Sequence, residues 1–455
     1  TPDVEINAVC FNSSTDYAPK EPFKVPPVRH STHYLNNYGA IGNGIADDTD
    51  ALQNALSALK PGDALYIPPG RYRFTKTLQI NTDNVSVMGS GTDSVLFAEF
   101  PKQSESKAAI SVSSNLPYAV KTPLIYSAKM LARELVITAN SALQTGDSVV
   151  VSSNEWGPPA PNLNTLFHRN RANIARIIET HIEGDTKKLT LDRPLLGPFL
   201  IENGAAVEKF RPITGIVFYK LAIEGTNKPI PADNADMSLI NVQRCDNCFF
   251  NDLHLSHARV AAIHFLRSLD SHATRVHIFD VTDTSGGGHG YGIVINRSQG
   301  IIVRDSLFDG ILRHGVPISW GTVESFIFRN KFDRSIQHEN NIQSIDIHGQ
   351  DDYANLVEQN KIIGGVMGIV VGGGGTTHGN DGPWNVIRNN IIVNSDDGIG
   401  VFKKTHNTII DRNSLINIKK RAIRIESGSD AAHIWNNRID NYGATAIILK
   451  DSKNG

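Results

Sequence analysis

Cysteine, methionine and tryptophan are scarce in this chain, with 3, 4 and 4 copies among 455 residues. Three cysteines are too few to build a disulfide scaffold. Cys245 and Cys248 lie close in the sequence, but no second pair is present to complete a zinc site. We therefore expect these cysteines to be buried thiols at a corner of a β-structure.

An excess of charge of one sign is also missing. Lys and Arg total 44 against 46 Asp and Glu, which leaves a formal net charge of −2. This balance argues against a nucleic-acid partner and against binding to a membrane surface. No apolar run reaches the roughly 18 residues that a membrane-spanning helix needs. Aromatic residues make up only 7%, which counts against an aromatic-lined binding groove.

The second half of the chain does contain a repeated apolar segment. Its eight copies read AIHF, GIVI, GVPI, SIDI, GIVV, GIGV, AIRI and AIIL, and they follow one another at intervals of 23 to 30 residues. Each unit can bury its apolar face only against the next one, which is typical of a solenoid. The aligned branched residues are Ile263, Ile293, Val316, Ile345, Ile369, Ile399, Ile423 and Ile447. The alternation predicts an all-β coil of parallel strands, with every second side chain facing outward.

Four segments follow from composition and pattern. Residues 1–35 are polar and form an extended lead-in, and residues 36–112 begin the coil. Within the second segment, the apolar spacing at 51–59 predicts an amphipathic capping helix. Residues 113–215 interrupt the repeat and predict an inserted β-rich subdomain. Residues 216–455 carry the regular rungs and the expected active-site groove.

The segment 38–50, the helix after it and the Pro-Pro-Gly corner at 68–70 resemble the start of the pectate-lyase-like right-handed β-helix superfamily. In these proteins a helix plugs the end of the coil and blocks edge-to-edge pairing. The resemblance covers about 36–112 and 216–455, and it implies a right-handed parallel β-helix. The superfamily includes polysaccharide lyases, uronan C5-epimerases, polygalacturonase-like hydrolases and phage tailspikes, so the fold alone does not select a function.

Ionisable residues gather at outward positions of the middle rungs. Asp346 and His348 protrude from one strand, and Arg313 and His314 stand at the start of the previous rung's strand. A histidine exchanges protons near neutral pH, a carboxylate orients it, and an arginine holds an anion. Asp397, two rungs further on, completes the candidate catalytic set. The alternative for these residues is an ordinary surface or turn position.

A second set of residues is expected to bind substrate. The basic stretch at 403–424 would attract an acidic polymer, although solvated turn charges explain it equally well. A tryptophan in the loop at 376–384 would stack on a sugar or simply pack. The candidates are Asp396, Arg421, Arg424, Lys404, His378, Trp384 and His289.

Two short motifs resemble those of particular enzymes. The segment 344–349, Ser-Ile-Asp-Ile-His-Gly, looks like the strand of alginate C5-epimerases that carries Asp-Pro-His-Glu. Asp346 and His348 match its Asp and His, whereas Ile347 and Gly349 stand in place of its Pro and Glu. The segments 394–398 and 421–425 look like the Asp pair and the Arg-Ile-Lys motif of polygalacturonases.

These patterns predict an enzyme that acts on a polysaccharide. The leading hypothesis is a lyase that cleaves an acidic, uronate-containing glycan by β-elimination, or a related C5-epimerase. Arg313 or a residue of the basic stretch would neutralise the uronate carboxylate. His348, oriented by Asp346, would move the proton, with His314 as the second acid–base candidate.

Two alternatives remain at this point. A glycoside hydrolase or transglycosidase would pair Asp346 with Asp396 or Asp397, near the inverting separation. A tailspike-like protein would bind a glycan without catalysis. The sequence requires no cofactor, but Ca²⁺ in place of the cationic residue is an open alternative without an identifiable ligand loop. The metal content and the choice between monomer and trimer stay open.

The expected compartment follows from this function. A start at Thr1 rather than Met fits the removal of a leader, and polysaccharide degradation is typical of secreted or periplasmic enzymes.

Overall fold

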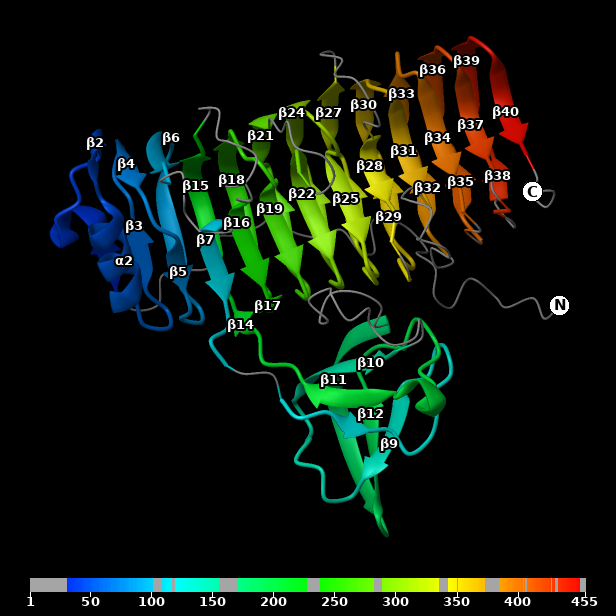
Figure 1. Cartoon of the computed structure of the whole chain (residues 1–455), viewed down its shortest axis with the longest axis horizontal. Coiled ribbons are helices and arrows are strands. Elements are labelled where there is room, and N and C mark those ends of the chain that lie inside the picture. The colour runs from blue at the N-terminus through cyan, green and yellow to red at the C-terminus, as the bar shows by residue number, and fades with distance from the viewer. Residues whose placement is uncertain are drawn as a thin grey trace.

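The computed structural model is a long coil of strands with a separate small sheet at its side (Figure 1). It describes residues 31–100, 108–116, 119–154, 171–226, 238–281, 289–334, 343–349, 351–372, 384–403, 405, 407–426, 428–429 and 433–450. Consecutive rungs pair in parallel, and the coil is a right-handed parallel β-helix, which confirms the predicted fold class.

One wall of the coil is an eleven-stranded parallel sheet, which we call the long sheet. Its strands are β5 (Leu78–Ile80), β7 (Ala108–Ser113), β16 (Ser238–Gln243), β19 (Ala261–Leu266), β22 (Tyr291–Asn296), β25 (Val316–Ser319), β28 (Gln343–Ile347), β31 (Met367–Val371), β34 (Asp397–Val401), β37 (Arg421–Ile425) and β40 (Thr445–Leu449).

The other walls merge into one sheet of 21 strands. These are β1 (Thr32–Tyr34), β2 (Asn43–Asp47), β3 (Ala64–Tyr66), β4 (Gly70–Phe74), β6 (Ser86–Ala98), β15 (Val217–Glu224), β18 (Phe249–Ser256), β20 (His272–Thr274), β21 (His277–Val281), β23 (Ile302–Arg304), β24 (Leu307–Ile311), β26 (Phe326–Phe328), β27 (Lys331–Arg334), β29 (Leu356–Glu358), β30 (Lys361–Gly364), β32 (Val386–Arg388), β33 (Ile391–Val393), β35 (Ile409–Asp411), β36 (Ser414–Ile418), β38 (His433–Trp435) and β39 (Arg438–Tyr442). A two-stranded corner pairs β14 (Ile213–Thr214) with β17 (Cys245–Asp246).

The eight branched residues of the sequence repeat stack in one column of the long sheet. The register pairs Ile263 with Ile293, and Ile399 with Ile423 and then Ile447. The first seven are fully buried in the core, whereas Ile447 on the last rung is 43% exposed. Burial of one such side chain contributes about 2 kcal/mol, so the repeat itself holds the rungs together.

A helix covers the N-terminal end of the coil. Helix α2 (Thr49–Ala58) buries Leu52, Ala55 and Leu56 against the coil's main core. Asp48 occupies its N-cap position, but the carboxylate accepts the backbone N–H groups of Ile41 and Gly42 instead of capping the helix. The amphipathic helix expected at 51–59 is therefore present, and it covers the N-terminal end of the coil as the resemblance implied.

Inside the coil an asparagine ladder runs along one corner. Asn360 accepts hydrogen bonds from the backbone N–H and the side-chain Nδ2 of Asn330, both at 3.0 Å. Its own Nδ2 donates to the Ile327 carbonyl and to Asn390, and Asn390 repeats the pattern with Asn413. These buried amides satisfy corner backbone groups that regular strand pairing leaves over.

Residues between the two parts of the coil form a second sheet with its own apolar core. Its six antiparallel strands are β8 (Thr122–Pro123), β9 (Glu134–Thr138), β10 (Ser148–Ser153), β11 (Arg171–Glu183), β12 (Thr186–Leu191) and β13 (Ala206–Lys209). We call it the inserted sheet. In Figure 1 it lies beneath the middle of the coil, on the side to which the arrows of β16 and β19 point.

Ion pairs fix the inserted sheet to corners of successive rungs. Arg171 donates to both carboxylate oxygens of Asp351, at 3.1 and 2.9 Å. Arg176 binds both oxygens of Asp246, at 2.9 and 2.8 Å. Breaking a buried pair such as Arg171 with Asp351 costs about 3–5 kcal/mol, so the inserted sheet is held in a defined place.

The two clustered cysteines are joined to each other. Cys245 and Cys248 are fully buried and form a disulfide across the corner that contains β17. The prediction of buried thiols is thus correct about burial and wrong about the free thiol, because the corner brings the two side chains together. In the described part of the chain, no helix is long and apolar enough to span a membrane.

Candidate functional site

The candidate site is centred on Asp346, in the middle of β28 on the outward side of the long sheet. Its neighbours Ile345 and Ile347 are fully buried in the core, so alternation turns the Asp346 carboxylate away from the core. The side chain is nevertheless only 3% exposed, which excludes the alternative of a solvated surface pair. Its Oδ1 atom has no hydrogen-bond partner among the residues that the structure describes.

Two histidines flank this carboxylate. The Nδ1 atom of His348 lies 3.0 Å from Asp346 Oδ2, and the Nε2 atom of His314 lies 3.5 Å from the same oxygen. The centres of the two imidazole rings are 6.0 Å apart. The structure therefore brings together the three residues that the sequence proposed as the acid–base set.

The charges of this cluster stabilise one another. Burial alone would lower the pKa of His348, but the Asp346 carboxylate outweighs burial and raises the pKa to about 9. Burial would likewise raise the pKa of Asp346, but His348, His314 and Arg313 outweigh it, and the pKa lies below its usual value. At neutral pH His348 is accordingly an imidazolium and Asp346 a carboxylate, and the exposed 20% of the His348 side chain presents a proton donor.

Tyr291 is a residue of this site that the sequence analysis did not single out. Its ring stacks on His314 with a centroid distance of 5.2 Å and an interplanar angle of 13°. The sequence feature that could have identified Tyr291 is its position one rung before His314 in the same outward column. Arg313 and His289 lie at this edge too: the Arg313 N–H donates to the Gly290 carbonyl at 3.0 Å, and His289 is half-buried beside it.

The position after His348 differs from the epimerase motif for a steric reason. A Cβ atom on Gly349 would lie 2.2 Å from the Trp320 backbone nitrogen and 2.7 Å from Asp352 Oδ2. This corner has no room for the glutamate that alginate C5-epimerases carry there. The match to that motif thus ends at the Asp and the His.

Asp397 is not a neighbour of Asp346. The register pairs Asp346 with Val370 and Gly400, whereas Asp397 pairs with Met367, which pairs with Gln343. Three positions along the strand and two rungs separate the two aspartates, on the order of 14 Å between Cα atoms. Inverting hydrolases hold their carboxyl groups about 6.5–9.5 Å apart. The register therefore does not place Asp397 opposite Asp346, because Asp397 lies in a different column.

Asp397 forms ion pairs with two arginines of the next rung. Arg421 donates to Asp397 Oδ1 at 2.9 Å and to Oδ2 at 2.8 Å, and Arg424 donates to Oδ2 at 3.1 Å. Asp396 binds Lys419 and Lys420, which lower its pKa against the effect of burial. These contacts favour a structural role, in which Asp396 and Asp397 tie their rung to the basic residues of the next one.

The remaining binding candidates differ in position. Trp384 is only 9% exposed and belongs to an apolar cluster with Leu196 of the inserted segment, so its ring packs and does not present a face to a sugar. Lys404 and His378 lie outside the described residues. Phe402, which the sequence did not mark, is half-buried in the His348 column and lies over Gly400, since a Cβ there would be 2.4 Å from its ring.

Comparison with known proteins agrees with the fold. A family model described as rhamnogalacturonase A/epimerase, pectate lyase-like, matches residues 35–156. Curated proteins give no match. The tailspike gp49 of Pseudomonas phage LKA1 is similar in structure, with a TM-score of 0.64, 14% identity, and coverage of 92% of this chain and 78% of that one.

Two further structures show the same fold. The Gp54 tailspike of Acinetobacter baumannii bacteriophage AP22, in complex with an A. baumannii capsular saccharide, has a TM-score of 0.55 and 13% identity over 93% of this chain and 72% of that one. DFA-IIIase from Arthrobacter chlorophenolicus A6, without its lid, has a TM-score of 0.55 and 12% identity over 93% of both chains. The chain therefore has the right-handed parallel β-helix fold of these structures, and its N-terminal part is similar to the pectate-lyase-like family model.

In this β-helix, the described residues include no group of three or more His, Cys, Asp and Glu side chains that could hold a metal ion. Asp351 and Asp352, the carboxylates nearest to a conceivable Ca²⁺ site, have other partners. Asp351 binds Arg171, and Asp352 Oδ1 accepts the backbone N–H groups of Gly321 and Thr322. Burial raises the pKa of Asp352 to about 7.

Proposed function

We propose that this protein is an enzyme that removes the C5 proton of a uronate unit in an acidic polysaccharide, as a β-eliminating lyase or a related C5-epimerase. The observation that carries the proposal is the buried Asp346 carboxylate between two imidazoles on the outward side of the long sheet. A surface ion pair does not need such burial, and shifted pKa values of this kind cluster at catalytic sites.

His348 acts as the proton donor in this proposal. Its Nδ1 atom faces Asp346, so its Nε2 atom is the one available to a ligand. With a pKa near 9 the ring is protonated at neutral pH. It can donate to the leaving glycosidic oxygen or lower the charge of the uronate carboxylate, and either interaction stabilises the transition state.

The base comes from the opposite side of Asp346. There the imidazole of His314 lies against the ring of Tyr291 and accepts the C5 proton. Arg313 stands at the same edge, close enough to lower the pKa of Asp346. Its guanidinium would neutralise the uronate carboxylate, which makes the adjacent C–H bond more acidic.

A non-catalytic glycan-binding protein is the second candidate. It is favoured by the tailspikes among the structures of similar fold, one of them in complex with a capsular saccharide. Binding alone gives no reason to bury a carboxylate with an unpaired oxygen beside two histidines. The two candidates differ in one measurable respect, because only the enzyme changes the polymer.

The test compares the wild type with His348→Ala and Tyr291→Phe on a panel of uronate polysaccharides, with neutral glucans as the reference. A lyase forms an unsaturated uronate that absorbs in the ultraviolet, and an epimerase exchanges the C5 proton without cleavage. We expect His348→Ala to lose about 10²–10⁴-fold in kcat and to stay folded, with a melting temperature lowered by the loss of the ion pair to Asp346. Tyr291→Phe keeps the ring stack and removes only the hydroxyl.

His433→Ala is the matched control, because His433 lies on β38 in another wall of the coil. Unchanged turnover in folded His348→Ala would remove the catalytic assignment. Binding of polymer by a wild type that never alters it would favour the second candidate.

A further inference from the structure

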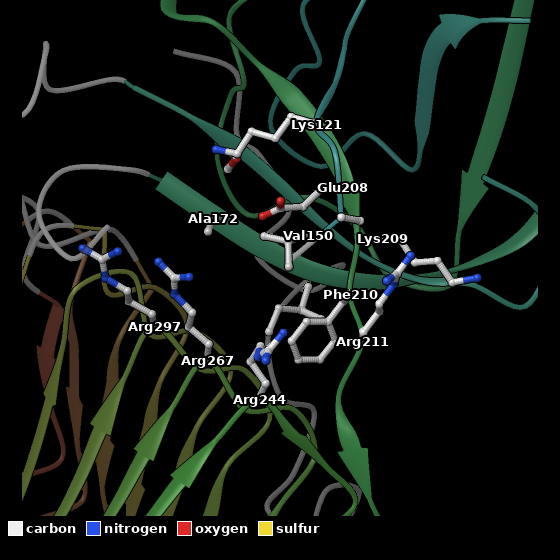
Figure 2. Close-up of a pocket in the computed structure, with 13 residues that line it drawn as sticks. Lys121, Val150, Ala172, Glu208, Lys209, Phe210, Arg211, Arg244, Arg267 and Arg297 are labelled. Atoms are coloured by element: carbon white, nitrogen blue, oxygen red, sulfur yellow. Dashed lines mark hydrogen bonds between the residues drawn. The ribbon is translucent and has the colours of Figure 1, made fainter. Parts of the chain in front are cut away.

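A cavity of about 240 Å³ lies between the inserted sheet and the coil. Strands β10, β11 and β13 form its roof, and the corners that follow β16, β19 and β22 form its floor (Figure 2). This volume is below the range of about 300–1,000 Å³ that is typical of sites for drug-sized ligands, so it suits a single small unit.

Three arginines line the floor in a row. Arg244, Arg267 and Arg297 each follow directly after a strand of the long sheet, and each has a left-handed backbone, with φ of 53°, 51° and 51°. The N–H of Arg244 donates to Leu266, and that of Arg267 to Asn296, so they stand one rung apart. Because strands pair at about 4.8 Å, the corner repeats the same cation at that spacing.

The rest of the lining adds more positive charge. Among the described residues, Lys121, Lys209 and Arg211 line the cavity with the three arginines, against one carboxylate, Glu208. Lys209 is paired with Asp147 outside it, at 2.5 Å. Burial raises the pKa of Glu208 even though Lys121, Arg267 and Arg244 act against burial, which weakens the negative charge of Glu208. Figure 2 shows Glu208 and Lys121 facing the arginine row from the inserted sheet.

One side of the cavity is apolar. Ile174 and Phe210 pack together with Leu269 in a small apolar cluster, and Val150 lies against it. A cavity that combines an apolar wall with guanidinium groups fits a ligand with C–H faces and an oxyanion. A sugar that bears a carboxylate or a sulfate has both features.

The arginine row ends two rungs before His348 of the candidate site. Asn296, which precedes Arg297, accepts a hydrogen bond from Ser319 at 2.7 Å, and Ser319 stands one rung before His348. Two rungs, roughly 10 Å, therefore separate the end of the row from the acid–base cluster. A glycan lying on this side of the long sheet spans that distance with a few sugar units.

We infer that this cavity is a subsite for an anionic sugar, which holds a carboxylate or sulfate group of the polymer a few units away from the reacting bond. The inference rests on the proposed function only in taking the ligand to be part of the substrate. The inserted sheet supplies the roof of the subsite, and the ion pairs of Arg171 and Arg176 keep it in position.

The binding test uses glucuronate, glucose 6-sulfate, inorganic sulfate and neutral glucose, titrated into the full chain by calorimetry or NMR. The wild type should bind both acidic sugars more tightly than glucose and more tightly than inorganic sulfate. Arg267→Gln should weaken acidic-sugar binding about tenfold or more, because a charge-assisted hydrogen bond is lost. Arg438→Gln, which removes one charge from the exposed strand β39, is the control and should change nothing.

A second variant separates charge from structure. Glu208→Gln removes the Glu208 carboxylate from the cavity, so it should tighten anionic-sugar binding several-fold, and a merely structural role would not produce that direction. If Arg267→Gln lowers the melting temperature, this variant alone decides. No preference of the wild type for acidic sugars, equal binding of inorganic sulfate, or unchanged affinity in Glu208→Gln would overturn the inference.

Failure of the proposed function gives a different signature. A wild type that binds glucuronate with these variant effects, but removes no C5 proton from any polymer, keeps the subsite and loses the reaction. In an active enzyme, Arg267→Gln should raise KM for an acidic polymer and leave kcat unchanged, because the cavity does not contact the reacting atoms.

Discussion

Replacement of Asp346 by Asn perturbs the charge that the proposed site depends on and leaves its shape nearly intact. In the wild type the carboxylate raises the pKa of His348 from about 6.5 to about 9 against the effect of burial. The amide of the variant no longer attracts the charged His348 ring, whereas the burial of His348, which lowers its pKa, is unchanged. We therefore expect the pKa of His348 in Asp346→Asn to fall to 6.5 or below.

The size of this effect follows from the shift itself. Each pKa unit corresponds to 1.36 kcal/mol, so the rise from about 6.5 to about 9 represents about 3 kcal/mol of stabilisation of the imidazolium. His348 would then be mostly neutral above pH 7 in the variant. The donor form would be lost, and turnover at neutral pH should fall together with the pKa.

Histidine ring resonances in NMR, followed from acid to alkaline pH, measure this directly. The His348 signal is assigned by its absence from His348→Gln. Asp397→Asn is the control, because it also replaces a buried aspartate by asparagine but in the separate ion-pair network of Arg421 and Arg424. It should leave the titration of His348 unchanged. A wild-type pKa near 6.5, or an equal pKa in Asp346→Asn, would refute the electrostatic reasoning.

Three further results follow from the structure. Because the folded state raises the pKa of His348, the stability that the charged ring contributes is complete below about pH 6.5 and is lost as pH rises through about 9. Because the folded state lowers the pKa of Asp346, the stability that its carboxylate contributes is present above pH 3.8 and is lost as pH falls through the folded pKa. The melting temperature of the wild type should therefore exceed that of Asp346→Asn most between about pH 3.8 and 6.5, and the two should converge above pH 9. Asp397→Asn should lower the free energy of unfolding by about 2 kcal/mol with kcat within a few-fold, and a loss of turnover with unchanged stability would restore a two-carboxylate mechanism. Asn360→Ala removes four buried hydrogen bonds and should cost about 3 kcal/mol in urea denaturation, whereas Asn37→Ala on the exposed surface should cost little.

The coil could be predicted from the sequence because its repeat consists of buried branched residues. The spacing between Ile263 and Ile447 was irregular, yet every aligned residue occupies one column, since the loops at the corners absorb the differences in length. The same alignment placed Asp346 and His348 on the outward side. His314 could be added because it lies just before Val316, the aligned residue of the preceding rung.

Features that depend on the corners were not predictable. Asp397 looked like a partner for Asp346 when rungs alone were counted, but the offset along the strand separates them. The disulfide between Cys245 and Cys248 depends on how one corner folds back. The cavity formed with Arg267 depends on the docking of the inserted sheet, and no periodic pattern encodes the contact between Arg171 and Asp351.

The account is tested most directly with a uronate polysaccharide that carries a hydrogen isotope at C5. Release of this label into water is common to β-elimination and epimerisation, and neither a hydrolase nor a binding protein causes it. We predict that the wild type releases the label from an acidic polymer and that His348→Ala, assayed at a temperature where it is fully folded, does not. Release at the same rate by both proteins, or cleavage of the polymer with the label retained, would contradict the account.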